Sequence, residues 1–290
     1  GAECVGLFRT EFLFMNGVSM PTEEEQFEVY KRAAVICKDK VLTIRTLDIG
    51  GDKDIPYMGL TKESNPFLGY RAIRFCLGRI DVFTTQLRAI LRASVYGNIR
   101  IMLPLITGVS EVRSVRTILQ NVMRELDSKE IPYDKDILLG VMIETPAACM
   151  LADILAKEAD FFSIGTNDLT RYTIAVDRGN ENVAYLYSAF HPAVLRSVKR
   201  IIECAKRENI EVGMCGEAAG NPAMIPLLLA FGLDEFSVTA SKVLETRKNI
   251  ASWTMKEAAA VTDTVMGMST EKEVSAYLSD YIATKMSNGK

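Results

Sequence analysis

The feature that most constrains the fold is a repeated alternation of short apolar runs with longer amphipathic stretches. Seven of the runs are rich in Val, Ile, Leu and Phe and are almost continuously apolar, as in strands covered on both faces of a parallel sheet. They are Val5–Arg9, Val41–Asp48, Ile99–Ile106, Leu138–Glu144, Asp160–Gly165, Glu211–Cys215 and Glu235–Thr239. The sequence therefore predicts an α/β fold with a parallel sheet.

The stretches between the runs carry signals for helix starts. Thr22 stands three residues before Glu25, which is the spacing of a capping box. Asp81 and Ser110 are predicted to cap the next two helices, and Pro146 is predicted to lie in the first turn of another. Further helices are expected at 193–208, 222–231, 241–248 and 271–286, and segment 65–77 is expected to be a turn followed by a helix.

This number of strand–helix units favours a closed (β/α)8 TIM barrel over an open sheet. Such a barrel has one strand more than the seven found, so we expect a first strand upstream of Gly1. Because no internal repeat or interdomain linker is apparent, residues 1–290 are predicted to form one barrel domain.

Charge and cysteine content restrict the classes of partner and compartment. The net charge is −3, which argues against bulk electrostatic binding to nucleic acid or to an anionic membrane. Neither a membrane-spanning apolar run nor a secretory signal is visible. The six cysteines show no CxxC spacing and are predicted to be free thiols in a reducing compartment. We therefore expect a cytoplasmic protein.

Polar side chains of chemical interest occur where the predicted strands end. They are Arg9, Arg45, Glu144, Asn167, Asp168 and Cys215. The C-terminal ends of the strands carry the active site in TIM barrels, because the loops that follow the strands converge there. The register of these residues therefore predicts one polar site.

Glu144 and Asp168 are the candidate metal ligands of this site. Carboxylates at the ends of neighbouring strands can face one pocket, and such hard oxygen donors suit Mg²⁺ or Mn²⁺. The alternative is that each carboxylate caps the helix that follows it.

Four arginines form a second candidate group: Arg9, Arg45, Arg71 and Arg178. Guanidinium groups bind phosphate or carboxylate through a planar pair of donors, so the implied ligand is an anion, such as a phosphate ester with a carboxylate. Lys53 could also reach that anion. The alternative is that each arginine pairs with a nearby Asp or Glu.

Cys215 and His191 are the remaining side chains that could take part in a reaction. A thiol with an ordinary pKa of about 8.5 stays mostly protonated at neutral pH, so Cys215 could serve as a general acid. The alternative for Cys215 is a buried structural thiol. His191, which precedes Pro192, is predicted to have a structural role at the start of a helix.

Nine motifs resemble enzyme I of the bacterial sugar phosphotransferase system, in the order that this family shows. They begin at Gly6 (GLFRTEFLFM), Arg45 (RTLDIGGDK), Asn65 (NPFLGYR), Met142 (MIETPAA), Phe161 (FFSIGTNDLT), Val176 (VDRGN), His191 (HPAVL), Gly213 (GMCGE) and Asp234 (DEFS). The resemblance covers nearly the whole chain and becomes weaker after about Ala251. It implies the C-terminal phosphoenolpyruvate-binding barrel of this family.

The resemblance implies a role for each candidate residue. Glu144 and Asp168 match ligands of Mg²⁺, and Cys215 matches the acid that protonates the departing enolate to give pyruvate. The positions that match substrate-binding residues are Arg9, Arg45, Arg178, Asn167 and Asp168, with Arg71 and Lys53 in supporting positions.

The resemblance also implies partners that this sequence does not contain. In this family an N-terminal portion carries the phosphorylated histidine and docks the small phosphocarrier protein HPr, and the barrel forms a homodimer. The isolated chain should therefore bind phosphoenolpyruvate and Mg²⁺ without completing the transfer. Two residues depart from the family pattern, Cys4 in place of Gly and Arg171 in place of Gln.

Three other functions remain open from the sequence. The chain could be a fragment of pyruvate phosphate dikinase or phosphoenolpyruvate synthase, which share the barrel. It could be a magnesium-dependent lyase or aldolase that acts on a pyruvate enolate. It could also be a regulatory module that senses phosphoenolpyruvate without chemistry.

Overall fold

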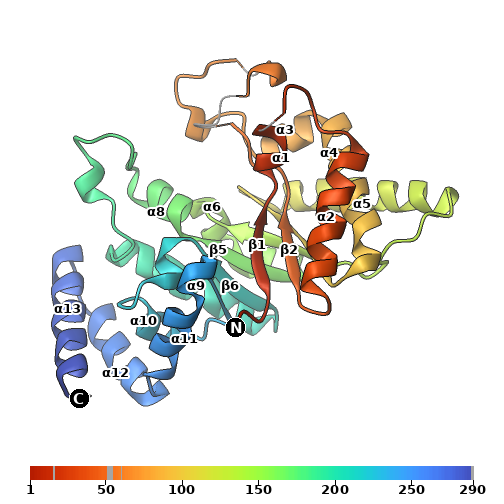
Figure 1. Ribbon diagram of the computed structural model, residues 1–290. Helices are drawn as coiled ribbons and strands as arrows, with labels where there is room; N and C mark the ends of the chain where they lie inside the picture. The colour runs from red at the N-terminus through yellow and green to blue at the C-terminus, as the bar shows by residue number, and fades with distance from the viewer. Residues whose placement is uncertain (16, 51–54, 60, 289–290) are drawn as a thin grey trace. The chain divides into compact units, whose positions relative to one another are not determined.

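Seven strands form the framework of the fold in the computed structural model, which describes residues 1–290 except 16, 51–54, 60, 289 and 290. The strands are β1 (Val5–Arg9), β2 (Leu42–Arg45), β3 (Ile99–Leu103), β4 (Leu139–Ile143), β5 (Phe161–Gly165), β6 (Glu211–Cys215) and β7 (Glu235–Ser237). Hydrogen bonds order them from β1 to β7 in one parallel sheet, in which β1 and β2 lie side by side (Figure 1). This is the strand order of a TIM barrel with seven strands in place of eight, so the predicted α/β class is confirmed.

Helices follow the strands, as expected for βα units. They are α1 (Glu11–Met15), α2 (Glu23–Cys37), α3 (Ile73–Gly78), α4 (Ile80–Ala93), α5 (Val109–Ser128), α6 (Pro146–Met150), α7 (Ala152–Leu155), α8 (Thr166–Ile174), α9 (Pro192–Arg207), α10 (Ile225–Phe231), α11 (Val243–Ala251), α12 (Met255–Met266) and α13 (Glu271–Asn288). Short 3₁₀ helices lie at Pro56–Met58, Pro66–Leu68, Ser94–Tyr96, Ala184–Leu186, Glu217–Gly220 and Ala240–Lys242. The predicted turn and helix in segment 65–77 are confirmed.

The chain divides into two compact units. The N-terminal unit comprises Glu3–Met142 and Lys157–Phe161, and the C-terminal unit comprises Gly1–Ala2, Ile143–Ala156 and Phe162–Lys290. Each unit has its own fully buried apolar side chains, such as Phe83 and Leu87 in the first and Ile201 and Leu228 in the second.

Three helices of the N-terminal unit pack side by side, with α4 between α2 and α5. The predicted capping box starts α2, because Glu25 donates its N–H to Thr22 Oγ1 at 3.2 Å and Thr22 donates its N–H to Glu25 Oε2 at 2.7 Å. The apolar stripe of α2 then buries Phe27 and Tyr30. The capping signal and the spacing of apolar residues thus agree on this helix.

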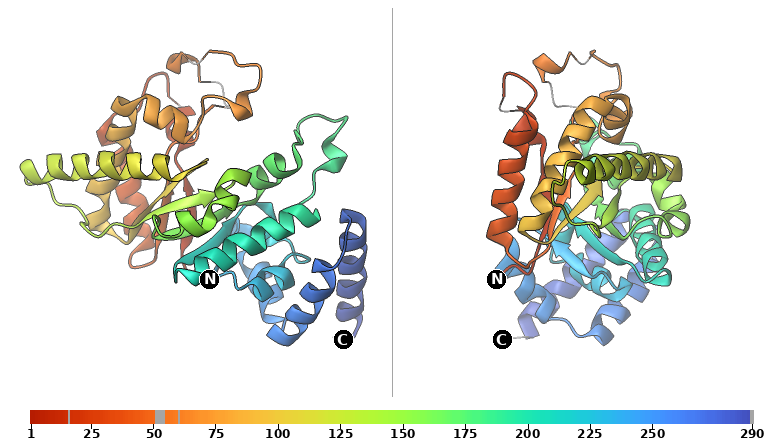
Figure 2. Two further views of the ribbon diagram at one scale, coloured as in Figure 1. Left: turned by 180° about the vertical axis from the view of Figure 1, so that it is seen from behind. Right: turned by 90° about the vertical axis from the view of Figure 1, so that its right-hand side faces the viewer.

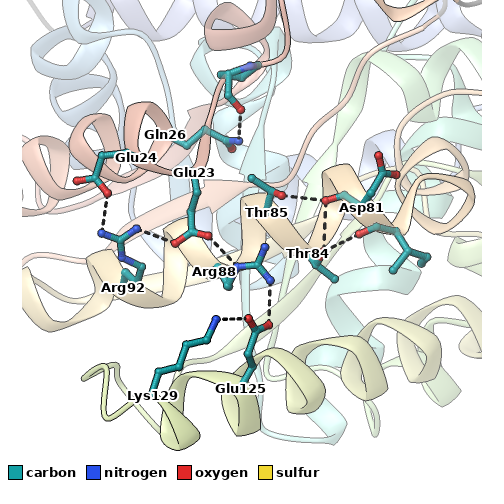
Figure 3. A network of polar contacts seen from close by, with 12 residues as sticks. Glu23, Glu24, Gln26, Asp81, Thr84, Thr85, Arg88, Arg92, Glu125 and Lys129 are labelled. Atoms are coloured by element: carbon teal, nitrogen blue, oxygen red, sulfur yellow. Dashed lines mark hydrogen bonds and ion pairs between the residues drawn. The ribbon is translucent and has the colours of Figure 1, made fainter.

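Charged side chains join the same three helices (Figure 3). Glu23 of α2 accepts hydrogen bonds from Arg88 at 2.7 Å and from Arg92 at 2.6 Å, both on α4. Arg88 also donates to Glu125 of α5 at 2.9 Å. Burial raises the pKa of Glu23, but the hydrogen bonds and charges of Arg88 and Arg92 outweigh burial and hold it below its usual value.

Two predicted helix caps are wrong. Asp81 lies inside the first turn of α4, where its carboxylate pairs with the guanidinium of Arg79 at 2.7 Å. Ser110 lies inside α5, whose N-cap is Gly108, and the carboxylate of Glu111 accepts the Gly108 N–H at 2.9 Å. In α5 the acidic side chain thus supplies the half of a capping box that satisfies the N–H of the N-cap residue, which here has no hydroxyl.

A helix that was not predicted, α12, follows α11 in the C-terminal unit. Thr254 and Glu257 form a capping box at its start. Glu257 also accepts a hydrogen bond from Lys285 of α13 at 2.9 Å, and Trp253 stacks on Tyr281 of α13. These contacts hold α13 beside α12 (Figure 2).

Candidate functional site

Arg9 and Arg45 end neighbouring strands of the N-terminal unit. The register pairs Arg9 of β1 with Arg45 of β2. Arg9 is exposed, whereas Arg45 is only 7% exposed. The two guanidinium groups therefore start from adjacent strand ends in very different environments.

Arg45 and Arg71 belong to a buried network with two carboxylates. Arg45 donates to Glu11 and lies 3.3 Å from Asp48. Arg71 donates to both carboxylate oxygens of Asp48, at 2.9 and 3.2 Å. Gly50 has φ +95°, and a Cβ there would lie 2.6 Å from the Cβ of Arg71, so only glycine allows this close approach.

Among the described residues, this network joins two guanidinium groups to two carboxylates. Arg45 and Arg71 therefore pair with nearby carboxylates, which was the alternative interpretation of the arginines. An anionic ligand would meet a preorganised guanidinium whose partners fix its orientation. Lys53 lies outside the described residues.

Glu144 directly follows β4 in the C-terminal unit and is 2% exposed. The N-cap of α6 is Thr145, whose Oγ1 accepts the N–H of Ala148 at 3.1 Å. Glu144 is therefore not the cap of this helix, and that alternative is excluded. Pro146 occupies the first helical position, as predicted.

Asp168 lies in the first turn of α8, directly after β5. The N-cap position is Gly165, so the capping alternative is excluded for Asp168 as well. Arg171 Nη1 donates to Asp168 Oδ1 at 2.7 Å, and the two side chains are 11% and 15% exposed. Helix α8 packs against α6, which begins beside Glu144.

Tyr187 connects a later loop to the start of α8. Its hydroxyl donates to the main-chain carbonyl of Asn167 at 2.9 Å. Burial raises the pKa of the Tyr187 phenol, and Arg178 and Arg171 are close enough to oppose that rise. The charge of Asp168 also acts on this phenol. We call Tyr187, Asn167, Asp168, Arg171 and Arg178 the C-terminal cluster.

Arg178 is the exposed cation of this cluster. Its guanidinium lies 3.6 Å from Glu217, and the two side chains are 46% and 83% exposed. An exposed pair of this kind holds its members weakly. The guanidinium of Arg178 can therefore exchange its partner for a ligand at low cost.

Cys215 ends β6 and is 4% exposed. Its thiol donates to the carbonyl of Ile164 at 3.7 Å and accepts from the hydroxyl of Ser163 at 3.5 Å. The next residue, Gly216, has φ +113°, and a Cβ there would lie 2.5 Å from Thr166 Oγ1. The thiol therefore keeps a fixed position at the end of β5, beside the first turn of α8.

Carboxylate oxygens are the available donors for a divalent cation. No group of three or more His, Cys, Asp or Glu side chains suited to a metal occurs in the part of the chain that the structure describes. Mg²⁺ does not need such a cage, because it commonly binds through one or two carboxylates and keeps water or phosphate oxygens as its other ligands. Glu144 and Asp168, at the ends of consecutive strands, fit that mode of binding.

The predicted site residues thus fall into two groups. Arg9, Arg45 and Arg71 lie in the N-terminal unit, and Glu144, Asn167, Asp168, Arg178 and Cys215 lie in the C-terminal unit. Within the C-terminal group, Tyr187 donates a hydrogen bond to the main-chain carbonyl of Asn167, and the charges of Asp168 and Arg178 act on its phenol. Sequence reasoning missed Tyr187 and Glu11, which no periodic signal marks as polar partners.

Two further predictions concern residues outside the cluster. His191 is the N-cap of α9, and its Nδ1 accepts the N–H of Ala193 at 3.2 Å, so the predicted structural role is confirmed. All six cysteines are free thiols. Among the described residues, no helix combines the length and the apolar character that crossing a membrane requires.

The strand order defines the class of the protein, an α/β domain of the TIM-barrel type. Residues 1–255 match the family described as "PEP-utilising enzyme, PEP-binding domain", in which PEP is phosphoenolpyruvate. Because this match covers most of the sequence, the chain belongs to that family.

Curated relatives narrow the comparison. The chain is 51% identical over 278 residues to the phosphoenolpyruvate-protein phosphotransferase of Geobacillus stearothermophilus, covering 96% of this chain and 48% of that protein. It is 49% identical over 280 residues to the protein of the same name from Bacillus subtilis, covering 97% and 49%. The predicted resemblance is confirmed, and the chain spans about half the length of these relatives.

Among solved structures, a citrate lyase from Burkholderia xenovorans matches with a TM-score of 0.45 and 16% identity. The match covers 69% of each chain. A likeness this weak supports no functional argument.

Proposed function

We propose that this chain is the part of a phosphoenolpyruvate-protein phosphotransferase that binds phosphoenolpyruvate and Mg²⁺. The observation that carries this proposal is the identity of about half of all residues, over nearly the whole chain, to relatives of that name. In the complete protein the phosphoryl group would pass to a histidine of another portion and then to HPr, with release of pyruvate. That reaction would be the first step of the bacterial sugar phosphotransferase system.

The arginines would hold the anionic substrate. Arg9, Arg45 and Arg178 would contact the phosphate, and Arg71 would support Arg45 through their shared partner Asp48. Phosphoryl transfer depends mainly on positioning and on neutralising the equatorial oxygens, and guanidinium groups supply both. The main chain and side chain of Asn167 would lie by the substrate carboxylate.

Glu144 and Asp168 would hold Mg²⁺ through carboxylate oxygens. When bound, the ion supplies charge neutralisation at the phosphate oxygens. The position of Glu144 supports this role, because Glu144 directly follows β4, and the helix that begins beside it, α6, packs against α8, which carries Asp168.

Cys215 would deliver the proton that converts the enolate into pyruvate. Its thiol holds a proton at Sγ, directed towards the carbonyl of Ile164, while Ser163 donates to the sulfur. Transfer of that proton to the methylene carbon forms a C–H bond and leaves a thiolate. Protonation makes the overall transfer favourable because it removes the enolate.

Two properties of the complete protein remain part of the proposal. The barrel would form a homodimer, as the resemblance implies. The protein would act in the cytoplasm, where six free thiols stay reduced.

The alternative of a dikinase or synthase fragment is less well supported, because the relatives reported above carry the phosphotransferase name. The lyase and the purely sensing module gain no specific support from the described residues.

Calorimetric titration of this chain tests the proposal. Phosphoenolpyruvate should bind in the presence of Mg²⁺ and bind at least about tenfold more weakly without it, since one lost ionic contact is worth roughly 1.4 kcal/mol or more. Glu144→Gln should remove the metal dependence. Glu158→Gln, which alters a partly exposed carboxylate paired with the exposed Arg113, is the matched control and should behave as wild type. Binding that is unaffected by both Mg²⁺ and Glu144→Gln would refute the metal assignment.

A further inference from the structure

The proposed function gives Asp168 a role as a metal ligand but gives none to Arg171, which pairs with it. The two residues are neighbours on one face of α8, three positions apart. Their 2.7 Å contact is largely shielded from water, since the side chains are 15% and 11% exposed. A shielded pair is less screened than a surface pair and is therefore stronger.

The carboxylate of this pair is also the proposed ligand of the divalent cation. A dication at Asp168 would lie within a few ångströms of the guanidinium that already contacts Oδ1, and the two positive charges would repel each other. Binding of the cation to Oδ2 of Asp168 would not remove this repulsion, because two charges a few ångströms apart repel each other whichever oxygen each contacts. Cation and guanidinium therefore compete for Asp168.

The place to which Arg171 can move is indicated by Tyr187. The hydroxyl of Tyr187 donates to the main-chain carbonyl of Asn167 at 2.9 Å, in the first turn of the helix that carries Arg171, and Arg178 lies in the segment between that helix and Tyr187. The exposed Arg178 is a proposed phosphate contact and pairs only weakly with Glu217. A guanidinium released from Asp168 would thus stay beside the arginine that receives the anion.

We propose that Arg171 is an exchangeable counter-ion, which neutralises Asp168 when no metal is bound and turns to the anionic substrate when the metal takes the carboxylate. This inference rests on the proposed function, because it assumes that Asp168 binds the cation. It assigns Arg171 as a positioning residue that couples the metal to the substrate, with a coupling that must be reciprocal between the two ligands.

Arg171→Gln tests this inference through two affinities. Free Mn²⁺, counted by electron paramagnetic resonance, gives the metal affinity without any need for activity. Removing the competing charge should tighten Mn²⁺ binding by about tenfold, in the range of ordinary coupling between sites. At saturating Mn²⁺, the same variant should bind phosphoenolpyruvate about fivefold more weakly, because one cation of the anion site is gone.

The opposite signs of these effects separate the inference from a folding defect. A damaged site would bind both ligands more weakly. Arg171→Lys keeps the charge and should lie between wild type and Arg171→Gln in both measurements. Arg113→Gln, which removes an exposed arginine of α5 from its pair with Glu158, is the matched control and should leave both affinities unchanged.

Thermal unfolding supplies a second readout. Loss of Arg171 removes the guanidinium that pairs with the largely shielded Asp168 carboxylate in the chelated protein, so the Tm in EDTA should fall. Added Mn²⁺ should then raise the Tm more in Arg171→Gln than in wild type, because the metal binds the variant more tightly.

Three results would contradict specific claims. Unchanged or weaker Mn²⁺ binding in Arg171→Gln, with binding lost in Asp168→Asn, would overturn the competition and leave the proposed function intact. Tighter Mn²⁺ binding with unchanged phosphoenolpyruvate affinity would overturn the release of Arg171 to the anion. Wild-type protein that binds no Mn²⁺, or Asp168→Asn that binds it normally, would overturn the metal assignment itself.

Discussion

The hydroxyl of Tyr187 donates to the main-chain carbonyl of Asn167 across 2.9 Å, although the two residues are 20 positions apart. This bond fixes the loop before α9 to the first turn of α8. Because Asp168 follows Asn167 and Arg178 belongs to the same loop, the bond sets the separation of a proposed metal ligand and a proposed phosphate ligand. The arrangement of the C-terminal cluster therefore depends on the hydroxyl of Tyr187.

Tyr187→Phe should weaken phosphoenolpyruvate binding by about fivefold, because loss of a single hydrogen bond of about 1 kcal/mol leaves the loop less ordered. Calorimetric titration at saturating Mg²⁺ measures the change. Tyr185→Phe is the matched control, since Tyr185 lies in the 3₁₀ helix that ends just before Tyr187 and is 80% exposed. Equal affinities for the two variants would show that the bond does not order the site.

Asp48→Asn should lower the free energy of unfolding by about 3 kcal/mol, because it leaves buried guanidinium charge without its carboxylate. Asp48 is 3% exposed and is the partner of both Arg45 and Arg71. Urea denaturation measures the loss. Glu158→Gln, which removes the partly exposed partner of the exposed Arg113, should cost no more than about 0.5 kcal/mol. A loss in Asp48→Asn no larger than in this control would contradict the proposed importance of burial.

Glu23→Gln should lower the free energy of unfolding by about 1 kcal/mol at neutral pH, a value discounted for partial exposure of the network. The pKa of Glu23 is depressed in the folded state, so its ionised form stabilises the protein above its usual 4.5. That contribution should disappear as pH falls from about 4.5 through the lower folded value. Denaturation curves at pH 7 and pH 3.5 should therefore differ more for wild type than for Glu23→Gln.

The control for that comparison is Glu28→Gln, which alters a carboxylate of the same helix that pairs only with Lys31 at the surface. Its stability should follow the wild-type pH profile within about 0.5 kcal/mol. A pH profile of Glu23→Gln that matched the profile of Glu28→Gln would mean that the network adds no pH-dependent stability.

Cys215→Ala, introduced into the full-length protein, should slow pyruvate formation by at least about a hundredfold, which is the lower end of what a positioned general acid contributes. Phosphoenolpyruvate binding should change little, because the thiol acts after the substrate is held. A coupled spectrophotometric assay measures pyruvate, and calorimetry measures binding. Cys204→Ala is the control, because Cys204 is also a buried thiol but lies in α9. Intact turnover in Cys215→Ala would mean that the proton comes from another group.

The strands were predictable because a strand that is buried on both faces needs a nearly continuous run of apolar residues. Each predicted run contains its strand, and the runs Val5–Arg9 and Glu211–Cys215 match β1 and β6 residue for residue. Helix caps were less predictable, because the groups that satisfy the first N–H donors can come from several positions. The capping box at Thr22 was found, whereas Asp81 and Ser110 fall inside their helices.

Position at a strand end was the main signal for the candidate site. It singled out Arg45, Glu144 and Cys215, and the burial of Arg45 and Glu144 was not foreseen. Tyr187 was missed because it lies in a loop with no period, and its partner is a main-chain carbonyl that any residue supplies. Glu11 was missed because its contact with Arg45 joins residues 34 positions apart.

The most direct test of the central claim is a crystal structure of this chain with Mn²⁺ and phosphoenolpyruvate, with the metal located by its anomalous scattering. The account predicts one metal peak bonded to Glu144 and Asp168, with the phosphate on Arg45 and the methylene carbon facing Cys215. A metal peak on other carboxylates, or phosphoenolpyruvate bound away from Arg45 and Cys215, would contradict it.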